Sequence, residues 1–180
     1  TYSQYVNLRF EVTSNAANAD WKLVTSNDLG LGTLAYFNPP GTSNAGVGVF
    51  NRFAAGWEAI AGNGGMTPGG LGFNTLVHEM GHGLGLAHPF DNGGESAILT
   101  GVIDTYDYAG YGWQNQGVYT VMTYNDGWPS RVAPSDTDYA HGYAWSPMAI
   151  DVAALQAMYG ANATAGAGDS VYFLENGQFF

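Results

Sequence analysis

Three of the chain's four histidines fall within eleven residues, in the stretch HEMGHGLGLAH from His78 to His88. Residues four apart on a helix are separated by about one turn, so the imidazoles of His78 and His82 would point the same way and could grip one metal ion. Glu79 is offset by about 100° from His78, which suits a carboxylate that reaches a metal-bound water rather than the metal itself.

Gly85 and His88 extend the pattern beyond the helix. Glycine adopts positive φ at no steric cost, so Gly85 would let the chain leave the helix sharply and bring His88 back as a third ligand. Three neutral imidazoles with one open position are typical of a catalytic zinc site, not of a closed structural one. A motif of this length rarely arises by chance, so we prefer this interpretation to histidines that merely lie on a helix face.

The ligands require a helix to present them, and the apolar pattern predicts one at 74–84. Short strands are predicted before it, and the segment 53–61 is ambiguous, with a short helix as one interpretation. A last helix is predicted to follow Ser146 as N-cap and Pro147 as first helical residue, and to end at Gly160. The strands are expected at 5–12, 21–24, 34–37 and 46–51, a long irregular loop at 89–117, and one more strand in the tail, 169–180.

The composition limits the class of partner. Four Lys and Arg residues against 15 Asp and Glu residues give a formal net charge of −11, which argues against nucleic acids and anionic membrane surfaces as partners. No run of about 18 apolar residues is present, so no segment is expected to span a bilayer. The absence of cysteine excludes disulfides and thiolate metal sites, and fits either the cytosol or an exported bacterial protein. The acidic, sparsely charged composition favours the exported, extracellular location.

The signature HExxHxxGxxH followed by a methionine turn resembles the metzincin zinc peptidases, and within them the serralysins. Pro89 follows the third histidine, as is typical of serralysins, and the stretch VMTY from Val121 to Tyr124 resembles their Met-x-Tyr turn. The stretches SPMAIDVAALQAMYGAN at 146–162 and GDSVY at 168–172 resemble the family's last helix and the strand after it.

This resemblance implies an α+β fold of the metzincin, zincin-like type. A twisted, mostly parallel sheet with one antiparallel edge strand would come from residues 5–51, with the active-site helix against it. The half from Pro89 onward would be irregular, with the cleft between the halves and zinc at its floor. Residues 1–180 would form a catalytic domain that is partial at both ends, because the helix before the first strand and the C-terminal calcium-binding β-roll of serralysins are missing.

The resemblance also assigns roles to residues. Glu79 would be the general base, and Met122 would form a hydrophobic floor under the metal. Tyr124 would bind zinc in the resting enzyme, move off as substrate binds, and donate a hydrogen bond to the developing oxyanion. The implied metal ligands are His78, His82, His88 and Tyr124.

The implied function is that of a secreted zinc endopeptidase. Its partners would be protein or peptide substrates, with a proteinaceous protease inhibitor as a further expectation. We expect the substrate to lie extended and to add a strand to the sheet. The expected substrate-binding residues are Gly46, Val47, Gly48 and Val49, in the last strand before the helix, where glycines permit close backbone approach.

Two alternatives stay open at this point. The chain could be a non-catalytic, acidic secreted module that binds calcium or carbohydrate, but such a module would have no use for Glu79. It could also be a metallohydrolase for non-peptide bonds, against which His88 and Met122 argue. His141 is interpreted as structural or solvated. The loop carboxylates Asp91, Glu95, Asp104 and Asp107 could hold calcium, although they lack EF-hand spacing and solvated surface is the preferred interpretation.

Overall fold

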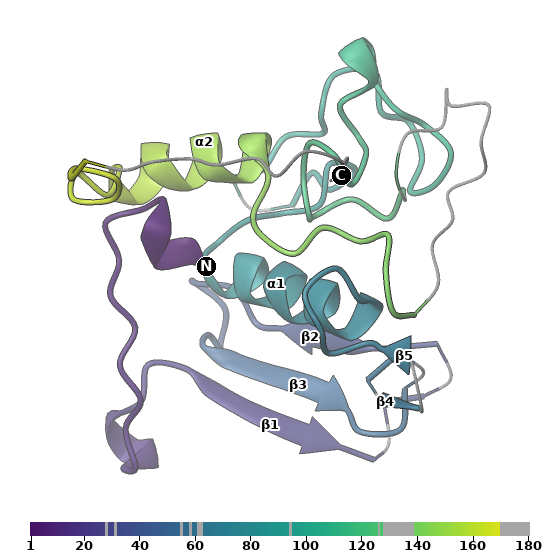
Figure 1. Ribbon diagram of the computed structural model, residues 1–180. Coiled ribbons are helices and arrows are strands. Elements are labelled where there is room, and N and C mark those ends of the chain that lie inside the picture. The colour runs from purple at the N-terminus through teal and green to yellow at the C-terminus, as the bar shows by residue number, and fades with distance from the viewer. Residues whose placement is uncertain are drawn as a thin grey trace.

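The computed structural model (Figure 1) describes residues 1–27, 29–30, 32–54, 56–57, 59–60, 63–93, 95–125, 127 and 139–169. Its main sheet has the order β1-β3-β2, in which β1 (Lys22–Ser26) is parallel to β3 (Val47–Asn51) and β2 (Ala35–Phe37) is antiparallel to it. A two-stranded antiparallel sheet joins β4 (Ala59–Ile60) to β5 (Asn63–Gly64). The α+β class with a mixed sheet is therefore confirmed.

Helix α1 (Leu71–Gly83) lies between the main sheet and helix α2 (Ala149–Tyr159), as Figure 1 shows. The ring of Phe37 fills the space between α1 and the sheet, and two glycines make that space. A Cβ atom on Gly48 of β3 would lie 2.6 Å from the Phe37 ring, and one on Gly83 of α1 would lie 2.8 Å from it. The helix can therefore approach the sheet closely only because both positions lack a side chain.

The principal core lies on the other side of α1. Tyr2 and Val6 from the N-terminal segment pack there against residues of both helices and of the methionine turn. The Tyr2 hydroxyl donates to the backbone oxygen of Val77, in the middle of α1, at 2.6 Å. The buried members of this core are Tyr2, Val6, Val77, Leu84, Leu86, Val121, Met122 and Leu155. The N-terminal segment thus buttresses the helix that carries the metal-binding motif.

The predicted first strand, 5–12, is wrong. The chain starts with a 3₁₀ turn at Tyr2–Gln4, and Val6 makes one isolated bridge to Ala161. Val12, although apolar, is fully exposed. The alternating pattern is present, but none of the described strands lies beside it to form a ladder.

Other boundaries also shift. Helix α1 begins three residues before the predicted start, at Leu71, while turns and β4 occupy part of the segment 53–61, so the short helix considered there is wrong. Helix α2 has Met148 as N-cap instead of Ser146, and Gly160 is its C-cap as predicted. The strand predicted in the tail falls almost wholly on 170–180, outside the described residues.

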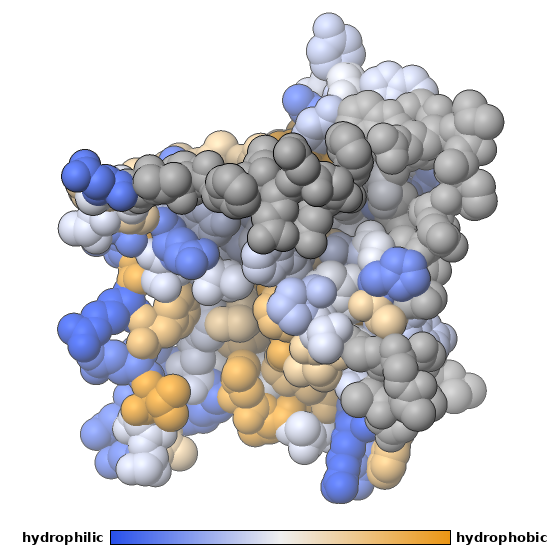
Figure 2. Space-filling model, in the orientation of Figure 1, coloured by the Kyte–Doolittle hydropathy of each residue, from blue (hydrophilic) through white to orange (hydrophobic). Residues whose placement is uncertain are grey.

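The segment 89–117 is irregular, as predicted, and its described part contains only a 3₁₀ turn at Tyr111–Trp113. Figure 2 shows one face of the molecule, on which apolar side chains gather over the main sheet. Leu23 and Val24 of β1 belong to the exposed apolar residues. None of the described helices is long and apolar enough to cross a membrane.

Candidate metal centre and active site

The three histidines of the motif converge on one point. The Nε2 atom of His88 lies 3.2 Å from Nε2 of His78 and 3.1 Å from Nε2 of His82. His78 and His82 come from consecutive turns of α1, while His88 returns from the loop after it. In the part of the chain that the structure describes, this is the only group of three His, Asp or Glu side chains placed closely enough to hold a metal ion.

Hydrogen bonds at the other ring nitrogen set the tautomer of each imidazole. The Nδ1 atom of His78 lies 2.7 Å from the Val121 backbone oxygen, and that of His82 lies 2.8 Å from the Leu86 backbone oxygen. A carbonyl oxygen can only accept, so both Nδ1 atoms carry the proton and both Nε2 atoms present a lone pair. Three such lone pairs repel one another unless a cation lies between them. The donor set therefore fits zinc, which takes neutral imidazole ligands.

The third ligand is oriented by a carboxylate. The Nδ1 atom of His88 donates to Oδ2 of Asp91 at 2.7 Å, and the His88 backbone N–H donates to the same oxygen at 3.2 Å. A carboxylate behind a metal-binding histidine fixes the ring and makes it a stronger ligand. The sequence favoured a solvated surface position for Asp91, with calcium binding as the alternative, and did not predict this role. The signal was its position three residues after His88, within reach of that ring.

Burial keeps two of the ligands neutral. It lowers the pKa of His78 to about 3 and that of His82 to about 4, and the neighbouring imidazoles act in the same direction. Protonation of one ring is disfavoured because the others lie so close. The two nitrogens from α1 are therefore free to bind a metal ion at neutral pH.

Glu79 lies beside the triad, with only 6% of its surface exposed. Burial raises the pKa of its carboxyl group to about 7, while a hydrogen bond from the Phe37 backbone acts in the opposite direction. Its Oε2 atom is buried and has no hydrogen-bond partner among the described residues. A carboxyl group with a free oxygen and a pKa near neutrality is suited to proton transfer.

The chain reverses direction at Gly85, where φ is +97°. The backbone N–H of Leu86 then donates to the oxygen of Gly81 at 2.9 Å, which closes the end of α1. An L side chain at this φ would be strained. Pro89 follows His88 and lines the cleft described below.

Met122 is buried beneath α1. A Cβ atom on Gly81, which lies between His78 and His82, would come within 2.7 Å of the Met122 sulfur. The residue before it, Val121, accepts the hydrogen bond from His78. The turn that carries Met122 therefore lies directly against the part of α1 that presents the ligands.

Tyr124 belongs to a cluster of rings around the third ligand. Its centroid lies 4.8 Å from that of His88 and 5.9 Å from that of His78. Phe90 stacks on His88 at 4.7 Å and meets Tyr124 edge-on at 5.1 Å. Burial and the nearby charge of Glu79 raise the pKa of the Tyr124 hydroxyl. The phenol is therefore protonated at neutral pH and available as a donor beside the triad.

A cleft of about 1190 Å³ runs past these groups. It is lined by Ala35, Tyr36 and Phe37 of β2 and by residues of the loop after His88, of the methionine turn and of α2. The charged residues in its lining are all acidic: Glu79, Asp91, Glu95 and Asp151.

The strand predicted to bind substrate does not lie at this cleft. β3 is the central strand, paired with β1 on one side and β2 on the other, so Val47, Gly48 and Val49 have no free edge. Gly46 precedes β3 and also does not line the cleft. The expectation rested on chain order, whereas the strand bordering the cleft is β2, which comes earlier in the sequence.

The remaining predicted residues lie apart from the triad. Glu95, Asp104 and Asp107 do not join Asp91 in a second metal-binding group within the described ranges. His141 is exposed. The structure thus gives no support to a calcium site in this loop.

The chain is similar to bacterial metalloproteases. It is 32% identical to a serralysin of Proteus mirabilis over 95% of its own length, and 32% identical to serralysin A of Dickeya chrysanthemi over 96%. It is 42% identical to the metallopeptidase AprA of Pseudomonas marginalis over 56%. No protein-family model matches the chain. The two longer matches take up 34% and 33% of the relatives' lengths, so the chain spans about a third of these relatives, and the predicted resemblance to serralysins is confirmed.

Proposed function

We propose that residues 1–180 form the metzincin-like catalytic part of a secreted zinc endopeptidase. One observation carries the proposal: three Nε2 lone pairs converge beside a buried, incompletely hydrogen-bonded carboxylate at the side of a long cleft. A site that only stored a metal ion would need no such carboxylate. The bacterial metalloproteases named above support peptide substrates for this chain. Secretion is part of the proposal because the resemblance to serralysins implies it.

His78, His82 and His88 would hold zinc. When bound, zinc supplies Lewis acidity that activates water and polarises a carbonyl group. Glu79 would take the proton from the attacking water and pass it to the leaving amine, for which its raised pKa is suitable. The Tyr124 hydroxyl would donate to the carbonyl oxygen of the substrate as negative charge develops there.

The substrate would lie extended along β2. This strand borders the cleft and, among the described strands, pairs with β3 alone, so a peptide would add along its other edge. Backbone hydrogen bonds to an added strand would give affinity that depends little on side chains. The Phe37 backbone also hydrogen-bonds to Glu79, so the same strand would place the scissile bond near the base.

The test combines metal analysis with digestion of casein by the chain as it stands. We expect one zinc per chain, casein cleavage, loss of cleavage on chelation, and its return when zinc is added back. Glu79→Gln should keep the zinc and lose the cleavage. Zinc-loaded protein that leaves casein and short peptides intact would overturn the proposal.

A further inference from the structure

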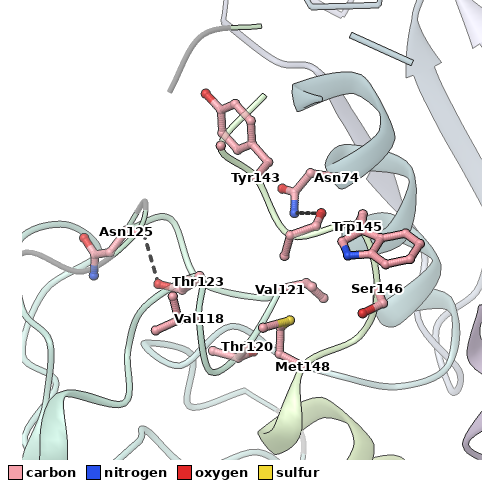
Figure 3. Close-up of a pocket in the computed structure, with 14 residues that line it drawn as sticks. Asn74, Val118, Thr120, Val121, Thr123, Asn125, Tyr143, Trp145, Ser146 and Met148 are labelled. Atoms are coloured by element: carbon pink, nitrogen blue, oxygen red, sulfur yellow. Dashed lines mark hydrogen bonds between the residues drawn. The ribbon is translucent and has the colours of Figure 1, made fainter. Parts of the chain in front are cut away.

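Asp151, near the start of α2, has a buried carboxylate that the proposed chemistry does not use. Only 1% of its surface is exposed. Its Oδ2 atom accepts the backbone N–H groups of Val121 and Met148, each at 2.8 Å. Its Oδ1 atom accepts the hydroxyl of Thr120 at 2.5 Å. One carboxylate thus caps α2 and holds the methionine turn, and Figure 3 shows Thr120 and Val121 beside Met148.

The Thr120 hydroxyl passes this restraint to the next peptide group. While it donates to Asp151, its oxygen accepts the backbone N–H of Met122 at 3.0 Å. That N–H belongs to the same planar peptide unit as the carbonyl of Val121. Fixing the N–H on one side of the plane therefore fixes the direction of the carbonyl on the other.

The carbonyl of Val121 accepts the Nδ1–H of His78 at 2.7 Å. An unbroken series of hydrogen bonds therefore runs from Asp151 through Thr120 and one peptide plane to a ligand of the triad. Both peptide groups flanking Val121 are held, one by Asp151 directly and the other through Thr120. Without them, rotation of the Val121–Met122 peptide would leave His78 with no acceptor at Nδ1.

We propose that Asp151 is a positioning residue of the metal site, which acts through Thr120 and Val121 to hold the tautomer and ring orientation of His78. The inference rests on the proposed zinc site and adds a partner from α2, 73 positions from His78 in the sequence. Outer partners of metal-binding histidines typically change metal affinity by about 10–100-fold. Asp151 should therefore affect zinc affinity, beyond any effect on folding.

Because Asp151 also caps α2, its removal alone would not separate the two effects. Thr120→Val separates them: it removes the hydroxyl, keeps the shape, and leaves the cap on Met148 intact. Thr120→Ser keeps the hydroxyl and serves as the rescue variant. Gln156→Ala is the matched control, since it removes the hydrogen bond from α2 to the Tyr5 backbone without touching the methionine turn.

The experiment measures zinc affinity by chelator competition, the visible spectrum of the cobalt-substituted protein, and the melting temperature of the metal-free protein. We expect Thr120→Val to weaken zinc binding about 10–100-fold and to change the cobalt spectrum. Thr120→Ser should stay within about threefold of the parent. Gln156→Ala should lower the melting temperature and leave the zinc affinity and the cobalt spectrum unchanged.

Asp151→Asn provides a second variant should Thr120→Val fold poorly. The amide oxygen can still accept from Val121 and Met148, but the NH₂ group would face the Thr120 oxygen and deprive its hydroxyl of an acceptor. We expect weaker zinc binding here too. Parent-like zinc affinity in both Thr120→Val and Asp151→Asn would overturn this inference and leave the proposed function standing. The same would follow if Gln156→Ala lost as much zinc affinity as these variants at the same drop in melting temperature. A parent chain that binds no zinc would overturn the proposed function as well.

Discussion

The two halves of the molecule build the same site by different means. In the half before Pro89, α1 and the sheet place His78, Glu79 and His82 by regular geometry, and apolar packing holds the helix in place. In the irregular half, side chains hydrogen-bond to the backbone instead. Asn115 is fully buried there; its amide donates to the Tyr108 oxygen at 2.7 Å and its Oδ1 accepts from Thr123 at 2.6 Å.

This difference shows how a segment without regular structure can still position ligands accurately. Each buried polar side chain satisfies backbone groups that a helix or strand would have paired within itself. Such a segment is therefore more sensitive to substitution, because each hydrogen bond depends on one particular side chain, whereas a helix forms its hydrogen bonds with many different residues. The predictions below test what each half contributes to metal binding and to the chemistry, and whether the halves differ in how they respond to substitution.

The largest effect should come from two of the ligands, one on α1 and one in the loop that follows it. His82→Ala and His88→Ala should both lose stoichiometric zinc and all measurable cleavage, because two imidazoles bind zinc far more weakly than three. Metal analysis after dialysis checks this. The control is His141→Ala, an exposed histidine outside the triad, which should keep one zinc per chain. Retention of stoichiometric zinc by either variant would show that the substituted histidine is dispensable for the metal.

Removing the base should separate chemistry from metal binding. Glu79→Gln should lower kcat by about 10²–10⁴-fold, the usual contribution of a general acid or base, with zinc content unchanged. Glu11→Gln, at an exposed glutamate that does not line the cleft, is the control and should cleave at the parent rate. Turnover close to that of the parent in Glu79→Gln would mean that another group accepts the proton.

Tyr124 tests the chemical contribution of the irregular half. Tyr124→Phe should keep zinc and lower kcat by about 10²-fold with little change in KM, because the lost hydrogen bond matters mainly in the transition state. Steady-state kinetics on one peptide measure both constants, and Tyr111→Phe, at an exposed ring, is the control. An unchanged kcat would make Tyr124 structural.

The buried carboxyl group of Glu79 also predicts that the stability of the metal-free protein depends on pH. The folded-state pKa of Glu79, about 7, lies above its ordinary value of 4.5, so its contribution to stability is lost as pH rises from about 4.5 through 7. Metal-free Glu79→Gln should therefore gain roughly 2–3 kcal/mol of unfolding free energy over the parent between pH 4.5 and pH 8. Denaturant titrations at both pH values measure this. A difference that does not change with pH would contradict the raised pKa.

The smallest effect should come from removing one buried polar side chain of the irregular half. Asn115→Ala should lower the free energy of unfolding by about 1–3 kcal/mol, since it leaves the Tyr108 oxygen and the Thr123 hydroxyl unpaired. Asn92→Ala, at an exposed position, should change it by less than about 0.5 kcal/mol. Equal stability of the two variants would mean that water replaces the lost bonds and that the polar network is not required.

The sequence predicted the features that are periodic or local. The spacing of His78 and His82 was sufficient to predict that they share one face of a helix, and Gly160 was sufficient to predict the end of α2. It did not predict features that depend on distant neighbours. The alternation at 5–12 has no partner among the described strands, the cap of α2 shifts to Met148 because Asp151 reaches back to its N–H, and β3 becomes central because β2 adds on its other side. Asp151 was missed as a partner of the site for the same reason, whereas Asp91 was missed although its position three residues after His88 was a local signal.

The ring of Phe37 between Gly48 and Gly83 has a consequence for how such sequences can diverge. Three positions, far apart in the chain, share one volume, so a methyl group gained at either glycine must be matched by a smaller side chain at 37. Related sequences should therefore change these positions together and not singly. Because the backbone at 37 also hydrogen-bonds to Glu79, such exchanges would alter the setting of the proposed base along with the packing.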